Sequence, residues 1–369
     1  MFRSFLKVVR EVYSEKFLWT LMVAAPVVAS VMIIAMLHAE TPLHLPVGIV
    51  LGERSNLATQ IVRAIEASPV TDVQEFCADV PECASKMRMG EISAIVVLEA
   101  GLERKARRHE APAVPVYTNA QVLLISNLVQ KDLRSSIGTC GAKLNLKFLK
   151  DPLSSEIHSI GNPTANFEAY LGFGLVSAIF HLAAMVTGVY LITWPLRAGK
   201  TKELLLLLGG SRPLFLAATC LPAAVMLPLE SCAFHLIVRS TISPVSALEF
   251  KVVLLAHFLT MFAALMFGLC AFGIFGNMRM ASSSAGVIGG PAFAFSGQTF
   301  PIFAMPAFGQ ILSGLLPLTH LISIESSMLL GDFAIVAVYK PLGTLGLLAL
   351  VFCAIGCTLT WLRLGRLDA

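Results

Sequence analysis

The hydrophobic pattern divides the chain into long apolar runs and one polar block. A helix needs about 20 apolar residues to cross a hydrocarbon core of roughly 30 Å. Apolar runs of this length or more occupy Phe17–Leu37, Phe167–Leu196, Pro213–Val238, Val252–Phe275, Ser282–Leu330 and Pro341–Leu362. The polar block, residues 38–166, lies between the first and second runs. This pattern predicts an α-helical polytopic membrane protein with an inserted water-soluble domain.

Composition agrees with a membrane protein, since 56% of residues are hydrophobic and only 14% are charged. The run Phe17–Leu37 is not a cleavable signal peptide. It is longer than a signal-peptide core, and no small-x-small cleavage site follows it before Thr41. We therefore expect it to be the first transmembrane helix.

The placement of Lys and Arg predicts the orientation. Short segments rich in these residues stay in the cytoplasm. Such segments are residues 1–16, the connection 197–212 and the tail 363–369. All three lie on one side only if the chain crosses the membrane six times. We therefore expect six transmembrane helices, a bundle over 167–362 after the first span 17–37, cytoplasmic termini and an extracytoplasmic block, because long domains translocate largely regardless of charge.

The run Ser282–Leu330 is broken by Gly, Ser and Pro. Six crossings leave one span in it, which we expect near Ser282–Phe295, followed by a re-entrant or hairpin region at 296–331 on the outer side. The interrupting prolines are Pro301, Pro306 and Pro317. Interrupted helices are tolerated in a bilayer only where protein or a cavity covers the freed backbone groups. The region is either an outer gate or a structural cap.

The polar block alternates strand and helix signals. Apolar runs of strand length are Leu45–Leu51, Val70–Phe76, Ile92–Leu98 and Val114–Tyr117. Helical segments are Ser55–Ser68, Asp79–Met89 and Val122–Ser136, the first opened by a capping residue. The alternation predicts an α/β domain with a small mixed or parallel sheet. The block contains no Ser/His/Asp order, no HExxH and no paired acidic motif, so we expect no catalytic residues in it.

Cys77, Cys83 and Cys140 are the cysteines of the polar block. In an oxidising periplasm two of them could pair, and Cys77–Cys83 is the nearest couple. Three free, partly buried thiols are the alternative. The remaining cysteines fall in predicted spans, where we expect packing roles: Cys220, Cys232, Cys270, Cys353 and Cys357.

Phe2–Lys16 has the pattern of a helix lying in the interface of an anionic leaflet. Its apolar face includes Phe5 and Val9, and Lys7 and Arg10 flank that face. The alternative is a frayed, positively charged N-terminus.

Ionisable residues within spans are costly and are candidates for function. They are Glu230, His181, His235 and His257. Glu230 lies roughly 25 Å along its helix at 1.5 Å per residue, near the outer interface. It either pairs with Arg239, faces water or contacts substrate. We expect neighbouring hydroxyls or carbonyls to satisfy the histidines and none to be a proton relay.

Two further motifs are more specific. KTKELLLLLGGSRP (Lys200–Pro213) follows the second run, and FSGQTFPIFAMPAFGQILSGLLPLTH (Phe295–His320) precedes the last. With VVREVYSEKFLWTLMVAAP (Val8–Pro26) and the stretches Leu45–Pro69 and Gly90–Arg104, they resemble the membrane subunits of ABC-2 type exporters. The closest subgroup has a large extracytoplasmic domain between its first two spans. The resemblance covers essentially the whole chain.

The resemblance implies that the connection 197–212 couples to an ATPase, whereas the charge rule alone indicates a basic anchor. Thr201, Glu203 and Leu205 match the family's Gly-Thr-x-Glu-x-Leu segment, although Lys200 replaces its Gly and the usual preceding acids are absent. The implied coupling residues are Arg197, Lys200, Thr201, Lys202, Glu203, Leu205 and Arg212. The implied outer gate or hairpin residues are Ser296, Gly297, Phe300, Pro301, Met305, Pro306, Pro317, Thr319 and His320.

The family fold is that of a type V ABC exporter. A permease of this kind forms a homo- or heterodimer in the bacterial inner membrane, and a separate cytoplasmic ABC ATPase binds ATP and Mg²⁺. Consistent with this division, residues Ala198–Thr201 contain GKT but lack the earlier Gly and the preceding strand of a P-loop. We expect no cofactor, metal or nucleic acid on this chain. The resemblance implies efflux of a hydrophobic or amphipathic, drug-like or lipid-like compound, with a periplasmic adaptor and outer-membrane channel as further expected partners.

Two other classes remain. An ion-coupled secondary transporter predicts inverted repeats and paired intramembrane acids, and neither is apparent in the sequence. A membrane-anchored sensor or assembly scaffold needs neither the basic connection nor the spans that follow the polar block.

Overall fold

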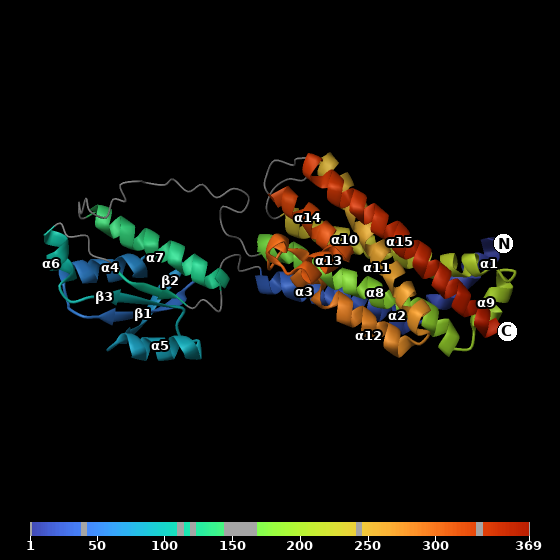
Figure 1. Cartoon of the computed structure of the whole chain (residues 1–369), viewed down its shortest axis with the longest axis horizontal. Coiled ribbons are helices and arrows are strands. Elements are labelled where there is room, and N and C mark those ends of the chain that lie inside the picture. Colours follow the sequence, from blue (N-terminus) through green and yellow to red (C-terminus); the bar gives the residue numbers. More distant parts are fainter. Residues whose placement is uncertain are drawn as a thin grey trace. The chain divides into compact units, whose positions relative to one another are not determined.

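The chain divides into two compact units, which are described separately (Figure 1). A helical unit is formed by Met1–Glu40 together with Ser159–Ala369, and a smaller unit by Thr41–His158. The computed structural model describes residues 2–37, 43–108, 114–118, 123–143, 168–240, 246–329 and 335–368.

The smaller unit contains a mixed four-stranded sheet. Its strands are β1 (Leu45–Leu51), β2 (Thr71–Cys77), β3 (Ala94–Leu98) and β4 (Val116–Thr118), in the order β2-β1-β3-β4. The central strand β1 pairs in parallel with both β2 and β3, and β4 runs antiparallel to β3. The predicted α/β pattern is confirmed, with β1 at the predicted residues and the other strands shifted by one or two residues.

Helices cover both faces of this sheet: α4 (Asn56–Glu66) and α7 (Leu123–Lys143) on one, α5 (Val80–Met89) on the other (Figure 1). Capping side chains determine where two of these helices, α4 and α5, begin. Ser55 Oγ accepts the Ala58 N–H at 3.2 Å, and Asp79 accepts the Glu82 N–H at 2.9 Å. The sequence did not predict α6 (Leu102–Arg107), and α7 extends beyond its predicted end at Ser136.

A disulfide joins Cys77, at the end of β2, to Cys83 in α5. It packs against the face of β1 where Gly48 lies. A Cβ atom at Gly48 would be only 2.7 Å from Cys83 Sγ and from Ile92 Cδ1, so the position needs glycine. This is the pairing that the sequence suggested as one alternative, between the two cysteines nearest to each other in the chain. The side chain of Cys140 lies outside the described residues.

Within its described residues, the helical unit contains five helical segments that are long and apolar enough to cross a membrane. The first is continuous through α2 (Lys16–Trp19), a π-helical turn η1 (Thr20–Ala24) and α3 (Ala25–Leu37). The others are α8 (Phe173–Arg197), preceded by the π-helical turn η3 (Glu168–Gly172), α10 (Arg212–Ser240), α11 (Ala247–Phe275) and α15 (Ile335–Asp368). The protein is therefore a polytopic helical membrane protein, and the predicted start of span two at Phe167 lies outside the described residues.

Close backbone packing of α8 against α11 forms the centre of the bundle. A Cβ atom at Gly188 would lie 2.1 Å from the Leu265 carbonyl oxygen, and one at Gly268 would lie 2.3 Å from the Met185 carbonyl oxygen. Small residues at such crossings let transmembrane helices approach closely. Buried apolar residues from α1, α8, α10, α11 and α15 surround this crossing.

The stretch between α11 and α15 is broken into short elements. These are α12 (Met278–Gly289), the 3-10 turns η4 (Pro291–Ser296) and η5 (Ile302–Ala304), α13 (Ala307–Leu315) and α14 (Pro317–Leu329). The single fifth span expected near Ser282–Phe295 is wrong as one continuous helix, because α12 ends at Gly289, just before Pro291. Its 12 residues span about 18 Å, less than a hydrocarbon core.

Prolines begin the elements that follow, as predicted for interrupted helices. Pro301 and Pro306 precede η5 and α13, and Pro317 is the first residue of α14. The axes of α13 and α14 differ by 83°. The helical unit has five or six candidate spans, depending on whether this bent pair counts as one, so six crossings remain a prediction. The predicted end of the hairpin at Gly331 lies outside the described residues.

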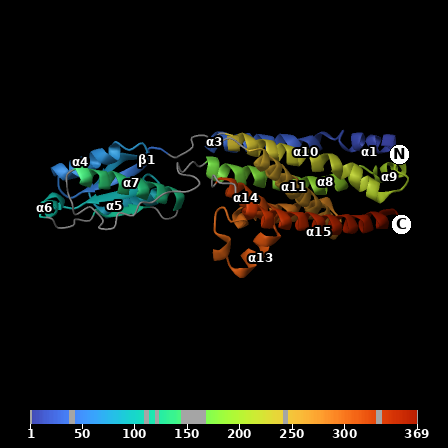
Figure 2. The same cartoon turned by 90° about the horizontal axis from the view of Figure 1, so that it is seen from above.

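The helices α1 (Phe2–Val12) and α9 (Thr201–Leu207) and the C-terminal end of α15 lie at the same end of the helical unit (Figures 1 and 2). Arg363, near the end of α15, donates hydrogen bonds to the Gly273 and Ile274 carbonyls at the end of α11, at 3.0 and 2.7 Å. The Arg212 guanidinium lies 5.5 Å from the Trp361 ring centre. The three basic segments used to predict orientation are therefore gathered at one end, here called the basic end.

Candidate functional site

The basic end carries a short helix, α9, between two turns. Gly199 has φ 67° before it, and Gly209 and Gly210 have φ 65° and 77° after it, so glycines in the left-handed region define both ends. Thr201, Leu204 and Leu205 of α9 are buried. The opposite face exposes Lys202, Glu203 and Leu206, whose side chain is 77% exposed. An exposed leucine one turn after two charged residues can contact a protein partner.

Contacts with α1 (Phe2–Val12) hold this connection in place. Lys200 Nζ forms an ion pair with Glu11 Oε1 and lies 5.6 Å from the Trp194 ring centre. The hydrogen bond from Lys200 to Glu11 raises the pKa of Lys200 above its ordinary value. Trp194 Nε1 in turn donates to Glu15 Oε2 at 2.9 Å. The N-terminal segment and the predicted coupling segment are therefore directly bonded.

A tyrosine fixes α1 against α10. Tyr13 Oη donates to the Thr219 carbonyl at 2.8 Å and accepts the Ala223 N–H at 3.0 Å. These two hydrogen bonds engage backbone groups of α10 next to Pro222. Pro222 has no backbone N–H, and its ring interrupts the regular hydrogen bonding of the helix.

The apolar face of α1 is divided between the bundle and the outside. Val8 and Val12 are buried, and Phe5 and Val9 pack partly against the same core. Lys7 and Arg10 are exposed, as an interfacial helix requires. Phe2 and Leu6, which the helical pattern places on the same apolar face, are 73% and 48% exposed beside these cations. The sequence pattern missed Val8 because it sits at the edge of the predicted apolar face.

The remaining predicted coupling residues also lie at the basic end. Arg197 is exposed, and one of its guanidinium nitrogens lies 3.1 Å from Met278 Sδ at the start of α12. Arg212 begins α10 beside Trp361. The structure thus brings the predicted set together, while its coupling role stays a prediction.

The predicted gate or hairpin region is held by local hydrogen bonds. Ser296 is buried and donates to the Phe293 carbonyl at 2.6 Å, and Gly297 has φ 89°. His320 Nε2 lies 3.0 Å from the Gly314 carbonyl oxygen. Tyr170 Oη donates to the Gln298 carbonyl at 2.7 Å, which ties this region to η3.

Large apolar side chains of this region face outward. The most exposed are Phe303 at 87%, Phe308 at 73% and Ile311 at 65%. By contrast, Met305 and Thr319 are buried, and Thr319 Oγ1 has no hydrogen-bond partner among the described residues. The arrangement fits both a lipid-facing cap and a gate, so the two alternatives from the sequence stay open.

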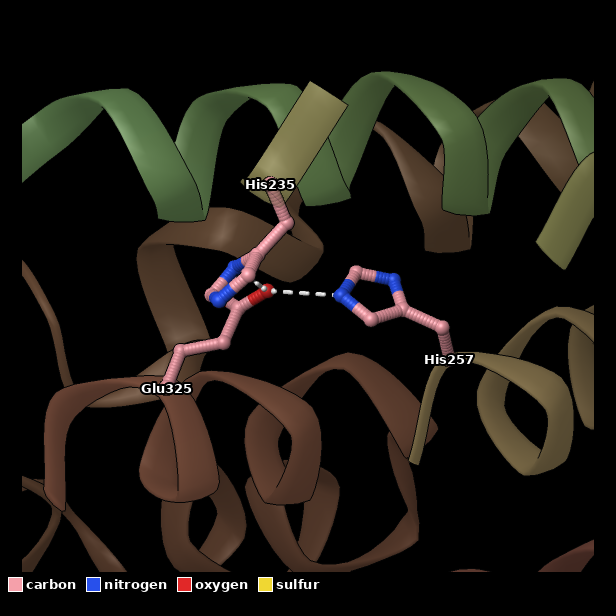
Figure 3. A group of neighbouring side chains, drawn as sticks. All are labelled: His235, His257 and Glu325. Atoms are coloured by element: carbon pink, nitrogen blue, oxygen red, sulfur yellow. Dashed lines mark hydrogen bonds and ion pairs between the residues drawn. The ribbon is translucent and has the colours of Figure 1, made fainter. Parts of the chain in front are cut away.

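A cluster of buried polar side chains lies deeper in the bundle (Figure 3). His235 on α10, His257 on α11 and Glu325 on α14 point toward one another, and each is at most 2% exposed. Glu325 Oε1 lies 3.1 Å from His235 Nδ1 and 3.4 Å from His257 Nε2. We call these three residues the His-His-Glu cluster.

Two serines and an aromatic ring surround the His-His-Glu cluster. Ser177 on α8 donates to Glu325 Oε1 at 2.6 Å, and Ser231 Oγ lies 2.9 Å from His257 Nδ1. The Phe173 ring packs 5.1 Å from the ring of His235. Four helices thus converge on one carboxylate oxygen.

Sequence reasoning identified only part of this cluster. His257 meets a neighbouring hydroxyl as expected, whereas His235 meets a carboxylate. Glu325 was overlooked, although an acid within the apolar stretch of α14 was a signal that could have revealed it. His181 contradicts the expectation of satisfied histidines, because neither ring nitrogen has a hydrogen-bond partner among the described residues. The His181 side chain is fully buried in α8.

Glu230, the other predicted intramembrane acid, lies outside the cluster. Its Oε2 has no hydrogen-bond partner among the described residues. Arg239 pairs with Glu249 at 3.6 Å. Nine residues, or about 13.5 Å of helix, separate Glu230 from Arg239, so the two cannot pair along one helix.

An apolar cavity of about 570 Å³ lies among α10, α11 and α15. Its lining includes Leu216, Phe262, Met266 and Trp361. A volume of this size is typical of pockets for drug-sized molecules. None of the predicted coupling, gate or intramembrane polar residues lines it.

These features define a helical membrane protein with a basic end, a buried polar cluster and an apolar cavity. Residues 16–357 match the model of a family described as ABC-2 family transporter protein. The chain therefore belongs to the ABC-2 transporter family. No curated protein matches the sequence.

Proposed function

We propose that the chain is the permease subunit of an ATP-driven exporter and that a separate cytoplasmic ABC ATPase docks on its basic end. The observation that carries the proposal is the assembly of α9 and α1. Lys200 and Glu11 bond the two segments, and α9 presents Glu203 and Leu206 outward. A partner that pushes on α9 would move α8 and α10, which flank it in the chain.

The proposed orientation places the basic end in the cytoplasm. This orientation is supported by the three Lys/Arg-rich segments that lie together at one end of the bundle, because such segments resist translocation. The smaller unit then lies outside the cytoplasm. The Cys77–Cys83 disulfide supports that placement, since disulfides persist in oxidising compartments such as the periplasm.

The proposed substrate is a hydrophobic or amphipathic compound. Support comes from the cavity among α10, α11 and α15, whose lining is almost entirely apolar. Burial of a drug-like or lipid-like molecule there would be favoured by roughly 25 cal/mol per Å² of apolar surface removed from water.

The proposed assembly contains two permease subunits. In the 18-residue apolar windows of the spans Lys16–Leu37 and Val338–Gly365, only 17% and 22% of the residues are buried. Lipid or a second subunit, identical or not, would cover these faces. A periplasmic adaptor and an outer-membrane channel are further proposed partners of the smaller unit.

An ion-coupled secondary transporter is the competing proposal. The His-His-Glu cluster favours it, because ion-coupled carriers use buried acids and histidines along their pathways. That class would not need an ATPase at the basic end.

Co-purification tests the proposed function. The chain is expressed with a candidate ABC ATPase, and both are isolated by a tag on the ATPase. We expect a stable complex with ATPase activity, and loss of the complex in Glu203→Lys. The matched control is Glu66→Lys, which reverses an exposed charge on α4 and leaves α9 intact. A complex that survives Glu203→Lys but not Glu66→Lys would place the ATPase contact elsewhere.

A further inference from the structure

The His-His-Glu cluster contains a buried acid without a permanently charged cation among its contacts in the described residues. Glu325 is 2% exposed, and its polar contacts there are Ser177 and the two histidines, which are charged only when protonated. An ionised carboxylate in an apolar interior is strongly unfavourable unless it is paired or coordinates a metal. The cluster therefore needs a positive charge, supplied by a proton or by a metal ion.

Two distances within the cluster match those between ligands of one metal ion. With metal–ligand bonds of 2.0–2.2 Å in tetrahedral geometry, neighbouring ligand atoms lie about 3.3 Å apart. Glu325 Oε1 lies 3.1 Å from His235 Nδ1 and 3.4 Å from His257 Nε2, and one ligand atom from each residue falls within 4.8 Å of the others.

All three of these residues also have unused polar atoms, and the one on His235 is Nε2. His257 Nε2 and Glu325 Oε2 are buried without a hydrogen-bond partner among the described residues. The 3.4 Å approach of His257 Nε2 to Glu325 is thus not a hydrogen bond. A metal ion bound by His257 Nε2 and the Glu325 carboxylate would give both unpartnered atoms a partner.

The surroundings of His257 also resemble those of a metal ligand. A metal-bound histidine almost always donates its second ring N–H to a polar partner, which fixes the tautomer. Ser231 Oγ, 2.9 Å from His257 Nδ1, is placed to accept that proton and leave the Nε2 lone pair facing the cluster. Phe173, which packs on His235, excludes water from the same region.

We propose that His235, His257 and Glu325 form a binding site for a divalent transition-metal ion, with Zn²⁺ as the fitting ion. Imidazole nitrogen with carboxylate oxygen suits Zn²⁺ and its neighbours in the series, whereas Ca²⁺ and Mg²⁺ take oxygen ligands. The bound ion connects α10, α11 and α14. The proposal does not depend on the proposed transport function.

Metal content of the purified full chain tests the site. The chain is isolated in detergent with its affinity tag removed, loaded with Zn²⁺, passed through a desalting column and measured by mass spectrometry. We expect about one zinc per chain, the stoichiometry of a single site. Glu325→Gln removes the charged ligand and should lose the zinc.

A matched control is His181→Gln, which changes another fully buried histidine of the same bundle and should keep the zinc. Ser231→Ala retains all three ligands and removes only the partner of His257. We expect it to lower zinc affinity about 10- to 100-fold, the usual effect of losing such a partner. This variant keeps the proposal testable if Glu325→Gln fails to elute as a folded protein.

Substitution with Co²⁺ gives a second readout. Ligand-field absorption bands should appear in the wild type and in His181→Gln and be absent in Glu325→Gln. The proposal is overturned if the loaded wild type holds no zinc above the buffer blank, or if Ser231→Ala and the ligand variant bind zinc as the wild type does.

Discussion

Glu11 and Lys200 lie 189 positions apart in the chain and form an ion pair that joins α1 to the turn before α9. Both side chains of the pair are solvent-accessible, so the pair contributes little to stability and mainly positions the two segments. It fixes the N-terminal helix against the segment that we propose as the ATPase contact.

Charge reversal at this pair should uncouple the ATPase from the permease. In Lys200→Glu the introduced carboxylate faces Glu11, so two acidic side chains repel each other. We expect lower ATPase activity of the complex with little change in its thermal stability. The swap Glu11→Lys with Lys200→Glu restores an attractive pair and should recover activity. Steady-state ATP hydrolysis by the reconstituted complex measures this. Equal activity in the single reversal and the swap would show that the pair has no role in coupling.

The crossing of α8 and α11 should tolerate no side chain at Gly188. A Cβ atom there would lie 2.1 Å from the Leu265 carbonyl oxygen, so Gly188→Ala must push the helices apart. Overpacking typically costs about 1–3 kcal/mol. The matched control is Gly343→Ala in α15, where a Cβ atom meets nothing within 4 Å. Thermal unfolding in detergent should show a lower midpoint for Gly188→Ala alone.

The disulfide should stabilise the smaller unit by about 2 kcal/mol, as expected for a short closed loop. We expect the Cys77→Ser, Cys83→Ser double variant to unfold at lower urea concentration, detected by pulse proteolysis of the smaller unit within the full chain. Reducing agent should produce the same change in the wild type and none in the double variant. A reductant-insensitive wild type would argue against the bridge.

The two units should respond differently to reagents outside the cell. A membrane-impermeant maleimide added to intact spheroplasts should label Glu66→Cys in α4 but not Lys202→Cys in α9, which should react only after lysis. Both positions are exposed, so accessibility to the reagent reports the side of the membrane. The reverse pattern would invert the proposed topology.

Local signals explain why much of the fold was predictable. The strand Leu45–Leu51 is a short apolar run bounded by polar turns, and Ser55 and Asp79 are capping residues that mark where a helix begins. The helix α6 escaped prediction because LERKAR buries only Leu102 and Ala106, too few for a periodic pattern.

The candidate sites were less predictable because their partners are distant in the chain. Glu325 meets Ser177 across 148 positions and His235 across 90. Apolar periodicity predicts which residues face the interior. It does not predict which of them contact one another. The basic end was predictable as a group, since clustered charge within each segment indicated a common side.

ATP-dependent transport in membrane vesicles tests the central claim most directly. Inverted vesicles that contain the chain and its ATPase are given ATP and a fluorescent amphipathic dye. We predict dye accumulation that requires ATP and the ATPase, survives collapse of the proton gradient and is lost in Glu203→Lys. Accumulation driven by a proton gradient in vesicles that lack the ATPase would contradict the account.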